Sequence, residues 1–215
     1  AIFYNPGALS QMNSDTEFFV SRVNWIADIA YSAAAVARDF GNFGTIGLHF
    51  IGSDYGEVIG TMVSSTANKG FVETGTVDVG AYVAGASYSR TLTNKFRVGG
   101  TIKYASQHLG ANIHEENGSE IENRVSGLAY DFGTVFYPGL NSLRLGVSFR
   151  NFSPQLKYEE TAFELPLTFR IGIAADLFDF IGGSQNHALL VDVDALHPRD
   201  YTERVHLGAE YVYRG

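Results

Sequence analysis

The sequence predicts an all-β protein: a transmembrane antiparallel up-and-down β-barrel of the outer-membrane type. Apolar and polar residues alternate in segment after segment, many of these segments are ten residues or longer, and the connections between them are alternately tight and long. A period of two gives a strand one apolar and one polar face. Strands of soluble proteins average about 5–6 residues, whereas a tilted strand that crosses a bilayer needs about 9–11.

Composition agrees with this fold class and excludes several functions. Only 18% of the 215 residues are charged, 24 are glycine and none is cysteine. The net charge of −8 and the lack of a basic run argue against a nucleic-acid partner, because phosphate binding needs clustered Lys and Arg. The lack of cysteine excludes disulfides, thiolate metal sites and cysteine nucleophiles. No stretch reaches the ~18 apolar residues of a membrane helix.

Ten strands are predicted. In order they cover 16–23, 27–39, 44–60, 78–92, 96–109, 122–137, 143–152, 165–178, 187–196 and 204–214. The segment 27–38 is rich in alanine, but it alternates, and it sets Ile29, Tyr31, Ala33, Ala35 and Ala37 against Asp28, Ser32 and Arg38. The segment 96–107 sets Phe96, Val98, Ile102 and Tyr104 against Arg97, Thr101, Lys103 and Gln107.

The C-terminal strands alternate most clearly. The segment 143–150 sets Leu143, Leu145, Val147 and Phe149 against Arg144, Gly146, Ser148 and Arg150. In 167–177 the apolar series from Leu167 to Leu177 opposes Thr168, Arg170, Gly172, Ala174 and Asp176. The last two strands set Val191, Val193, Val205 and Leu207 against Asp192, Asp194, Arg204, His206, Gly208 and Glu210. Small residues with charges of both signs are typical of a packed lumen, so we expect the apolar faces to point outward.

The connections predict which ends of the strands lie together. Those at 41–43, 92–95 and 137–141 are compact turns, whereas 61–77, 108–121 and 153–164 are long. Outer-membrane barrels have short turns on the periplasmic rim and long loops on the extracellular rim. This rhythm favours the membrane barrel over a soluble barrel, which shows the same alternation with its apolar side chains inside.

The opening residues resemble a known family. Residues 1–9, Ala-Ile-Phe-Tyr-Asn-Pro-Gly-Ala-Leu, resemble the A-x-F-Y-N-P-A-G-L segment that precedes the first strand of FadL-type outer-membrane proteins, above all in the PorV/PorQ group. Here Gly7-Ala8 replaces the usual Ala-Gly order. Further similar segments are 25–28, 43–48, 98–104, 143–148 and 165–172.

The resemblance implies a location in the outer membrane of a Gram-negative bacterium and a fourteen-strand barrel with an N-terminal plug in its lumen. About ten of those strands are then present: residues 1–15 are the end of the plug, and 16–215 are the barrel, truncated at its C-terminus. The resemblance also implies a PorV-like part in type IX secretion, in which the loops bind secreted cargo or translocon partners.

Two other functions remain open: a FadL-like channel for hydrophobic small molecules, and a structural barrel in a larger envelope assembly. A lipid channel should have large apolar residues facing the lumen. The inward positions assigned by alternation are small or charged, which favours the secretion role or a purely structural barrel over the lipid channel.

The candidate site is a lumen charge network. Its predicted members are Asp28, Arg97, Lys103, Asp131, Arg144, Arg150, Arg170, Asp176, Asp192, Asp194, Glu210 and Arg214. Buried charges persist only when they are paired, so we expect a structural ladder, with ion selectivity as the alternative. Asn5, Pro6 and Gly7 are expected to form a turn that delivers the chain into the first strand, or else part of a movable plug.

Neither a metal, a cofactor nor an enzymatic activity is expected. Asp192 and Asp194 share one face, and His197 follows, a set that suits a metal or acid–base chemistry. Neutralisation by Arg170 and Arg204 on neighbouring strands is the favoured interpretation. The sequence has no Gly-x-Ser-x-Gly motif, no phosphate-binding loop, and no Ser–His pair placed together on the outer wall.

Overall fold

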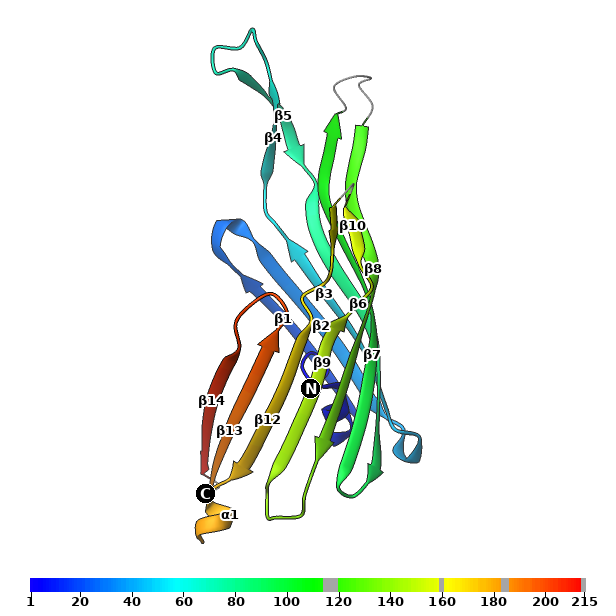
Figure 1. Cartoon of the computed structure of the whole chain (residues 1–215), viewed down its shortest axis with the longest axis vertical. Coiled ribbons are helices and arrows are strands. Elements are labelled where there is room, and N and C mark those ends of the chain that lie inside the picture. Colours follow the sequence, from blue (N-terminus) through cyan, green and yellow to red (C-terminus); the bar gives the residue numbers. More distant parts are fainter. Residues whose placement is uncertain (114–119, 159–160, 183–185, 214–215) are drawn as a thin grey trace.

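The computed structural model describes residues 1–113, 120–158, 161–182 and 186–213. Within these ranges the chain is all-β, and ten strands form one antiparallel sheet (Figure 1). In sheet order the strands are β1 (Thr16–Asn24), β2 (Ala30–Asp39), β3 (Thr45–Asp54), β6 (Val79–Thr93), β7 (Phe96–Ile113), β8 (Glu120–Phe136), β9 (Arg144–Phe152), β12 (Thr168–Asp176), β13 (His187–Pro198) and β14 (Arg204–Tyr213). This order confirms the predicted antiparallel meander, since each of the ten predicted strands is present.

The third predicted strand is shorter than expected. It was predicted over 44–60, but β3 ends at Asp54, and Val58–Val63 form a separate strand, β4. The Asp54 side chain accepts a hydrogen bond from the Gly56 amide at 3.0 Å, and Gly56 has a φ of 76°. Such an Asx turn, with a residue in the left-handed region, ends the strand.

Two of the predicted long loops contain hairpins of their own. β4 pairs with β5 (Phe71–Val77), and β10 (Leu156–Tyr158) pairs with β11 (Thr161–Phe163). The β4–β5 hairpin projects far beyond the sheet (Figure 1). The third predicted loop, 108–121, is largely strand, because β7 continues to Ile113 and β8 begins at Glu120. Its middle, 114–119, lies outside the described residues.

The three predicted tight turns and the three predicted long connections lie at opposite ends of the strands (Figure 1). Antiparallel pairing places successive connections at opposite ends of the strands. The tight turns at 40–44, 94–95 and 137–143 share one end with α1 (Phe178–Ile181) (Figure 1). The opposite end, called here the long-connection rim, carries both hairpins together with the shorter connections 25–29 and 199–203. Helical turns are η1 (Pro6–Gln11), η2 (Ile26–Asp28) and η3 (Gly41–Phe43).

The sheet is a curved wall and does not close. β1 and β14 are its two edges, and no pairing joins them within the described part of the chain. The inner face curves around the N-terminal segment, whose η1 contacts β3, β6, β7 and β8. Among the described residues, no helix is both long and apolar enough to cross a membrane.

The predicted assignment of faces is right for most strands and wrong for β2. On β12, Ile171 and Ile173 lie on the outer face and are 46% and 43% exposed, as predicted. On β2, Ala35 and Ala37 instead pack inward against Ile2 of the N-terminal segment. The two faces of an alanine run hardly differ in polarity. Contact with the apolar N-terminal segment therefore determines which face of β2 points inward.

Candidate functional site

The N-terminal segment is held inside the wall by Asn5. Its side-chain oxygen accepts a hydrogen bond from the Gly7 amide at 2.9 Å and so caps η1. Its side-chain nitrogen donates to the carbonyl of Thr134 on β8 at 3.1 Å and to that of Val147 on β9 at 3.3 Å. Pro6 follows at the first position of η1 and is buried. The predicted Asn5-Pro6-Gly7 turn is therefore a docking contact with two strands of the wall.

Glycines let two backbones approach where the segment meets the wall. A Cβ on Gly7 would lie 2.5 Å from the carbonyl oxygen of Gly133. A Cβ on Gly99 would clash with the backbone of Pro6, and one on Gly133 would clash with the Asn5 side chain. Real Cβ atoms do not approach so closely, so these three glycines are required for this fit.

The other side of the segment is apolar. Ile2 and Leu9 form a buried cluster with Ala37, and Phe3, Met12 and Ala35 pack around it. Beside them lies a groove with a volume of about 630 Å³ between the N-terminal segment and strands β1 and β2, lined in part by Met12 and Phe19. Sequence reasoning missed this apolar inner region because it lies between the N-terminal segment and a strand whose faces were assigned the wrong way round.

Lys103 and Asp131 form the most buried ion pair of the predicted network. Their side chains are 8% and 5% exposed, and Lys103 Nζ lies 2.7 Å from Asp131 Oδ1. Asn151 completes the group. Its side-chain Oδ1 accepts a hydrogen bond from Lys103 Nζ at 2.5 Å, and its backbone N–H donates to Asp131 Oδ1 at 2.8 Å. Pairing and additional hydrogen bonds are what buried charges need. No pattern in the sequence indicated a role for Asn151, which has a φ of 62°.

Tyr4 connects two further members of the network. The Arg150 and Arg170 guanidinium carbons each lie 5.8 Å from the centre of its ring, within cation–π range. Arg170 also donates to Asp194 Oδ2 at 3.4 Å. Tyr4 lies directly before the Asn5-Pro6-Gly7 turn, so the aromatic ring attaches the segment to the charged wall.

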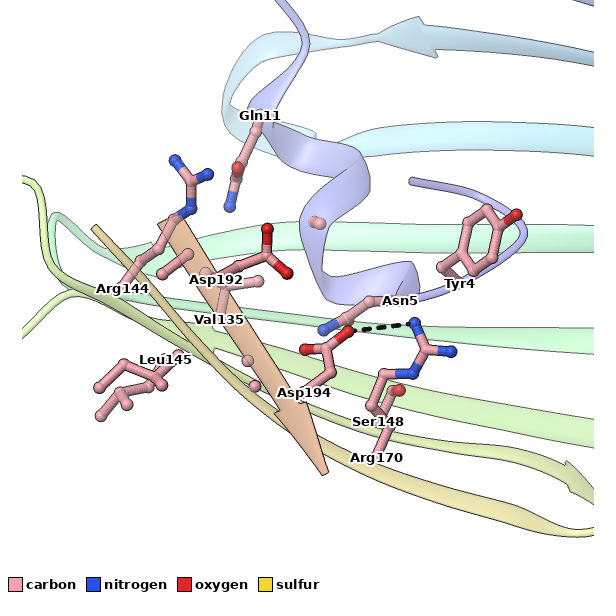
Figure 2. Close-up of a pocket in the computed structure, with 15 residues that line it drawn as sticks. Tyr4, Asn5, Gln11, Val135, Arg144, Leu145, Ser148, Arg170, Asp192 and Asp194 are labelled. Atoms are coloured by element: carbon pink, nitrogen blue, oxygen red, sulfur yellow. Dashed lines mark hydrogen bonds and ion pairs between the residues drawn. The ribbon is translucent and has the colours of Figure 1, made fainter. Parts of the chain in front are cut away.

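A cavity of about 220 Å³ lies between the N-terminal segment and strands β9, β12 and β13 (Figure 2). It collects four predicted charges, Arg144, Arg170, Asp192 and Asp194, as well as Asn5. The two carboxylates extend over glycines of neighbouring strands, Asp194 over Gly172 and Asp192 over Gly208. Charged side chains of both signs therefore line part of the cavity, beside small residues and apolar ones such as Val135 and Ile173.

The remaining predicted charges lie apart from this cavity. The Arg97 guanidinium stacks on Tyr137, 4.7 Å from the ring centre. Asp176 accepts from the amides of Phe178 and Leu189 and thus holds the start of α1. Glu210 is exposed on the edge strand β14.

Asp28 is a correction to the predicted network. It lies in η2 at the long-connection rim, with a φ of 58°, and is exposed. The strand was predicted to begin at residue 27, inside this turn, because the positive φ values of Ala27 and Asp28 leave no pattern in the sequence. Arg214, also predicted, lies outside the described residues.

His49 was missed by the sequence analysis. It lies on β3 facing inward, 7% exposed, with its ring 5.4 Å from that of Phe3 in an edge-to-face contact. Its Nδ1 is buried without a hydrogen-bond partner among the described atoms. A single histidine between Leu48 and Phe50 gave no reason to expect a buried imidazole.

The geometry does not assemble a metal site at Asp192, Asp194 and His197. His197 binds Glu203 at 3.0 Å and lines a pocket with Phe149 and Phe169 on the outer face, away from the two carboxylates. In the part of the chain that the structure describes, no three His, Asp, Glu or Cys side chains are grouped to hold a metal ion.

Comparison of the chain with protein-family models and with curated proteins finds no match.

Proposed function

We propose that this chain is part of the wall of a plugged outer-membrane β-barrel that binds protein partners at its long-connection rim, as a PorV-like component of type IX secretion does. The observation that carries the proposal is the β4–β5 hairpin, which projects beyond the wall (Figure 1). Its apolar side chains are exposed. Val63 is 89% exposed and Ile59 55% exposed. Recognition on a rigid scaffold is usually carried by its connections.

The outer face supports membrane insertion. Its exposed apolar side chains occur on both edge strands and on six strands between them, and they include Phe18, Val20, Leu48, Phe50, Ile102, Leu128, Phe132, Phe149, Ile171, Val193, Val205 and Leu207. A water-soluble monomer rarely exposes an apolar surface of this extent. In lipid, the free edges of β1 and β14 need hydrogen-bonding partners, so the proposal requires additional strands between them.

The inner face supports a binding role over an open pore. The N-terminal segment occupies the space enclosed by the wall and is fixed to β8 and β9 through Asn5. The charges around it are largely engaged with one another or with Tyr4. A protein that conducts ions would need this segment to leave.

The test is co-purification from outer membranes in mild detergent, followed by mass spectrometry. We expect the wild type to retain a large translocon subunit, or secreted proteins that share a C-terminal sorting domain. The variant Ile59→Ser/Met62→Ser/Val63→Ser removes the apolar surface of the hairpin and should lose these partners. Leu140→Ser, an equally exposed position in a tight turn at the opposite end, is the matched control. Recovery of the barrel without protein partners would overturn the proposal.

A second candidate, uptake of hydrophobic small molecules, is favoured by the apolar groove beside Met12 and Phe19. This groove provides the large inward apolar residues that the sequence analysis had not found. Organic extraction of the purified protein should then release a fatty acid or another apolar molecule. Replacing Met12 by Gln should reduce the amount recovered, whereas equal recovery from both proteins would count against this function.

A further inference from the structure

Two opposite charges line the cavity between the N-terminal segment and strands β9, β12 and β13, with a small residue between them. Ala174 on β12 pairs in register with Arg144 on β9 and with Asp192 on β13. Neighbouring strands lie about 4.8 Å apart, so the Cα atoms of the arginine and the aspartate are separated by roughly 10 Å. The next row on this face consists of Gly146, Gly172 and Asp194. Small residues therefore leave open space between Arg144 and Asp192.

Arg144 and Asp192 differ from the other charges of the cavity in having no partner. Both are half-buried, and neither makes an ion pair or a hydrogen bond with any residue that the structure describes. By contrast, Arg170 donates to Asp194 at 3.4 Å and contacts the ring of Tyr4. A charge removed from bulk water costs free energy unless it is paired. The cavity therefore offers one guanidinium and one carboxylate to a ligand.

The remaining walls of the cavity suit a small ligand with a short apolar part. Figure 2 shows the ends of Arg144 and Asp192 directed into the cavity beside Gln11 of η1. The Gln11 carboxamide can both donate and accept hydrogen bonds. Val135 of β8, which is 6% exposed, adds an apolar surface. The volume of about 220 Å³ is below the roughly 300–1,000 Å³ of pockets for drug-sized ligands, so the ligand has few heavy atoms.

We propose that this cavity binds a small α-amino acid in its zwitterionic form. Arg144 binds the carboxylate, because a guanidinium donates two parallel hydrogen bonds to such a group. Asp192 accepts from the ammonium, Gln11 completes the polar contacts, and a short apolar side chain lies against Val135. Asp192 repels a simple anion and Arg144 repels a simple cation, so the two residues together select a ligand that carries both charges. This inference goes beyond the proposed binding of protein partners at the rim and does not depend on it.

The experiment is isothermal titration calorimetry of the full chain in non-ionic detergent at neutral pH. The probes are L-alanine, propionate, which lacks the ammonium, and ethylamine, which lacks the carboxylate. Loss of one charge-assisted contact changes affinity about tenfold, so we expect L-alanine to bind about tenfold more tightly than either of the other probes. No measurable binding of L-alanine, or equal affinities for L-alanine and propionate, would overturn the proposal.

Two single variants locate the binding in this cavity. Arg144→Gln and Asp192→Asn each remove one charge and should weaken the binding of L-alanine about tenfold. The matched controls change charged residues outside the cavity: Arg97→Gln, on the inner face against Tyr137, and Glu210→Gln, on β14. Both controls should bind L-alanine like the wild type. Equal losses in Arg144→Gln and Arg97→Gln, or in Asp192→Asn and Glu210→Gln, would overturn the assignment to this cavity.

The same variants give a gain of binding that misfolding cannot produce. Asp192→Asn removes the repulsion of an anion, so it should bind propionate more tightly than the wild type does while it binds L-alanine more weakly. Arg144→Gln should likewise gain affinity for ethylamine. If one variant does not fold, as judged by circular dichroism, the other performs the same test with its own probe. A folded variant that gains no affinity for its probe would show that the two charges do not face the ligand.

Discussion

Lys103 on β7 and Asp131 on β8 form a buried ion pair, with 2.7 Å between nitrogen and oxygen. They do not lie directly opposite each other, because Asp131 pairs in register with Thr101 and Lys103 pairs with Ala129. The lysine side chain therefore reaches diagonally to the neighbouring strand. This contact, together with Asn151, ties β7, β8 and β9 together on the inner face of the wall.

Removing one partner of this pair should destabilise the wall strongly. Asp131→Ala leaves the Lys103 ammonium buried without a counter-charge, so we expect the free energy of unfolding to fall by about 3–5 kcal/mol. The double variant Lys103→Met/Asp131→Leu removes both charges and should lose much less. Urea unfolding in detergent micelles, followed by circular dichroism, measures both. Equal losses would show that charge pairing does not explain the stability.

Gly99 should be essential for docking of the N-terminal segment, whereas its neighbour Gly100 should not be. Gly99→Ala places a methyl group against the Pro6 backbone, and overpacking of this kind costs about 1–3 kcal/mol. Gly100→Ala meets its nearest atom at 3.6 Å, an ordinary contact. The chain has no cysteine, so an Ala8→Cys reporter on the segment can be labelled selectively with a maleimide. We expect Cys at position 8 to be labelled faster in the Gly99→Ala protein than in the parent protein, and at the parent rate in the Gly100→Ala protein.

The strand order could be predicted because alternation and turn length are local properties of the sequence. The segment 143–150 shows why: Leu145 and Val147 alternate with Gly146 and Ser148, and this contrast determines both the strand and its outer face. In β2 the contrast is missing, since Ala33, Ala34 and Ala35 differ in nothing but position. The assignment of faces failed there because it depends on a partner distant in sequence.

The site was predictable in its composition but not in its contacts. Arg170 and Asp194 could be assigned to the inner face from alternation alone, and the structure brings them to one cavity. Tyr4 could not be connected to Arg150, because a contact across 146 positions depends on the curvature of the whole wall. The positive φ of Asp28 likewise left no pattern to detect.

Tyr4 should stabilise the docked segment through its ring and not through its hydroxyl. Arg150 and Arg170 both contact the ring face, and cation–π contacts are worth about 0.5–2 kcal/mol each. Tyr4→Phe keeps the ring. With the Ala8→Cys reporter present in both proteins, the cysteine should be labelled as slowly in Tyr4→Phe as in the parent protein. Tyr4→Leu retains apolar volume without a π system and should label faster. Faster labelling of Tyr4→Phe would assign the effect to the hydroxyl instead.

Glu203 at the long-connection rim should titrate below the usual range for a glutamate. Hydrogen bonding to its own backbone amide lowers the pKa of the Glu203 carboxyl, and the hydrogen bond and charge of His197 lower it further. A carboxyl with a lowered pKa stabilises the fold above its unfolded pKa, and this contribution is lost as the pH falls through the folded pKa. The effect is expected to be small, because the group is fully exposed.

An NMR titration of the Glu203 side-chain carboxyl carbon in detergent micelles measures this shift directly. In the wild type we expect a midpoint below the usual value for glutamate. His197→Ala should move the midpoint upward but not fully back, because the backbone amide, the largest contribution, still donates. A complete return would assign the whole shift to His197, and a wild-type midpoint at the usual value would exclude both contacts in solution.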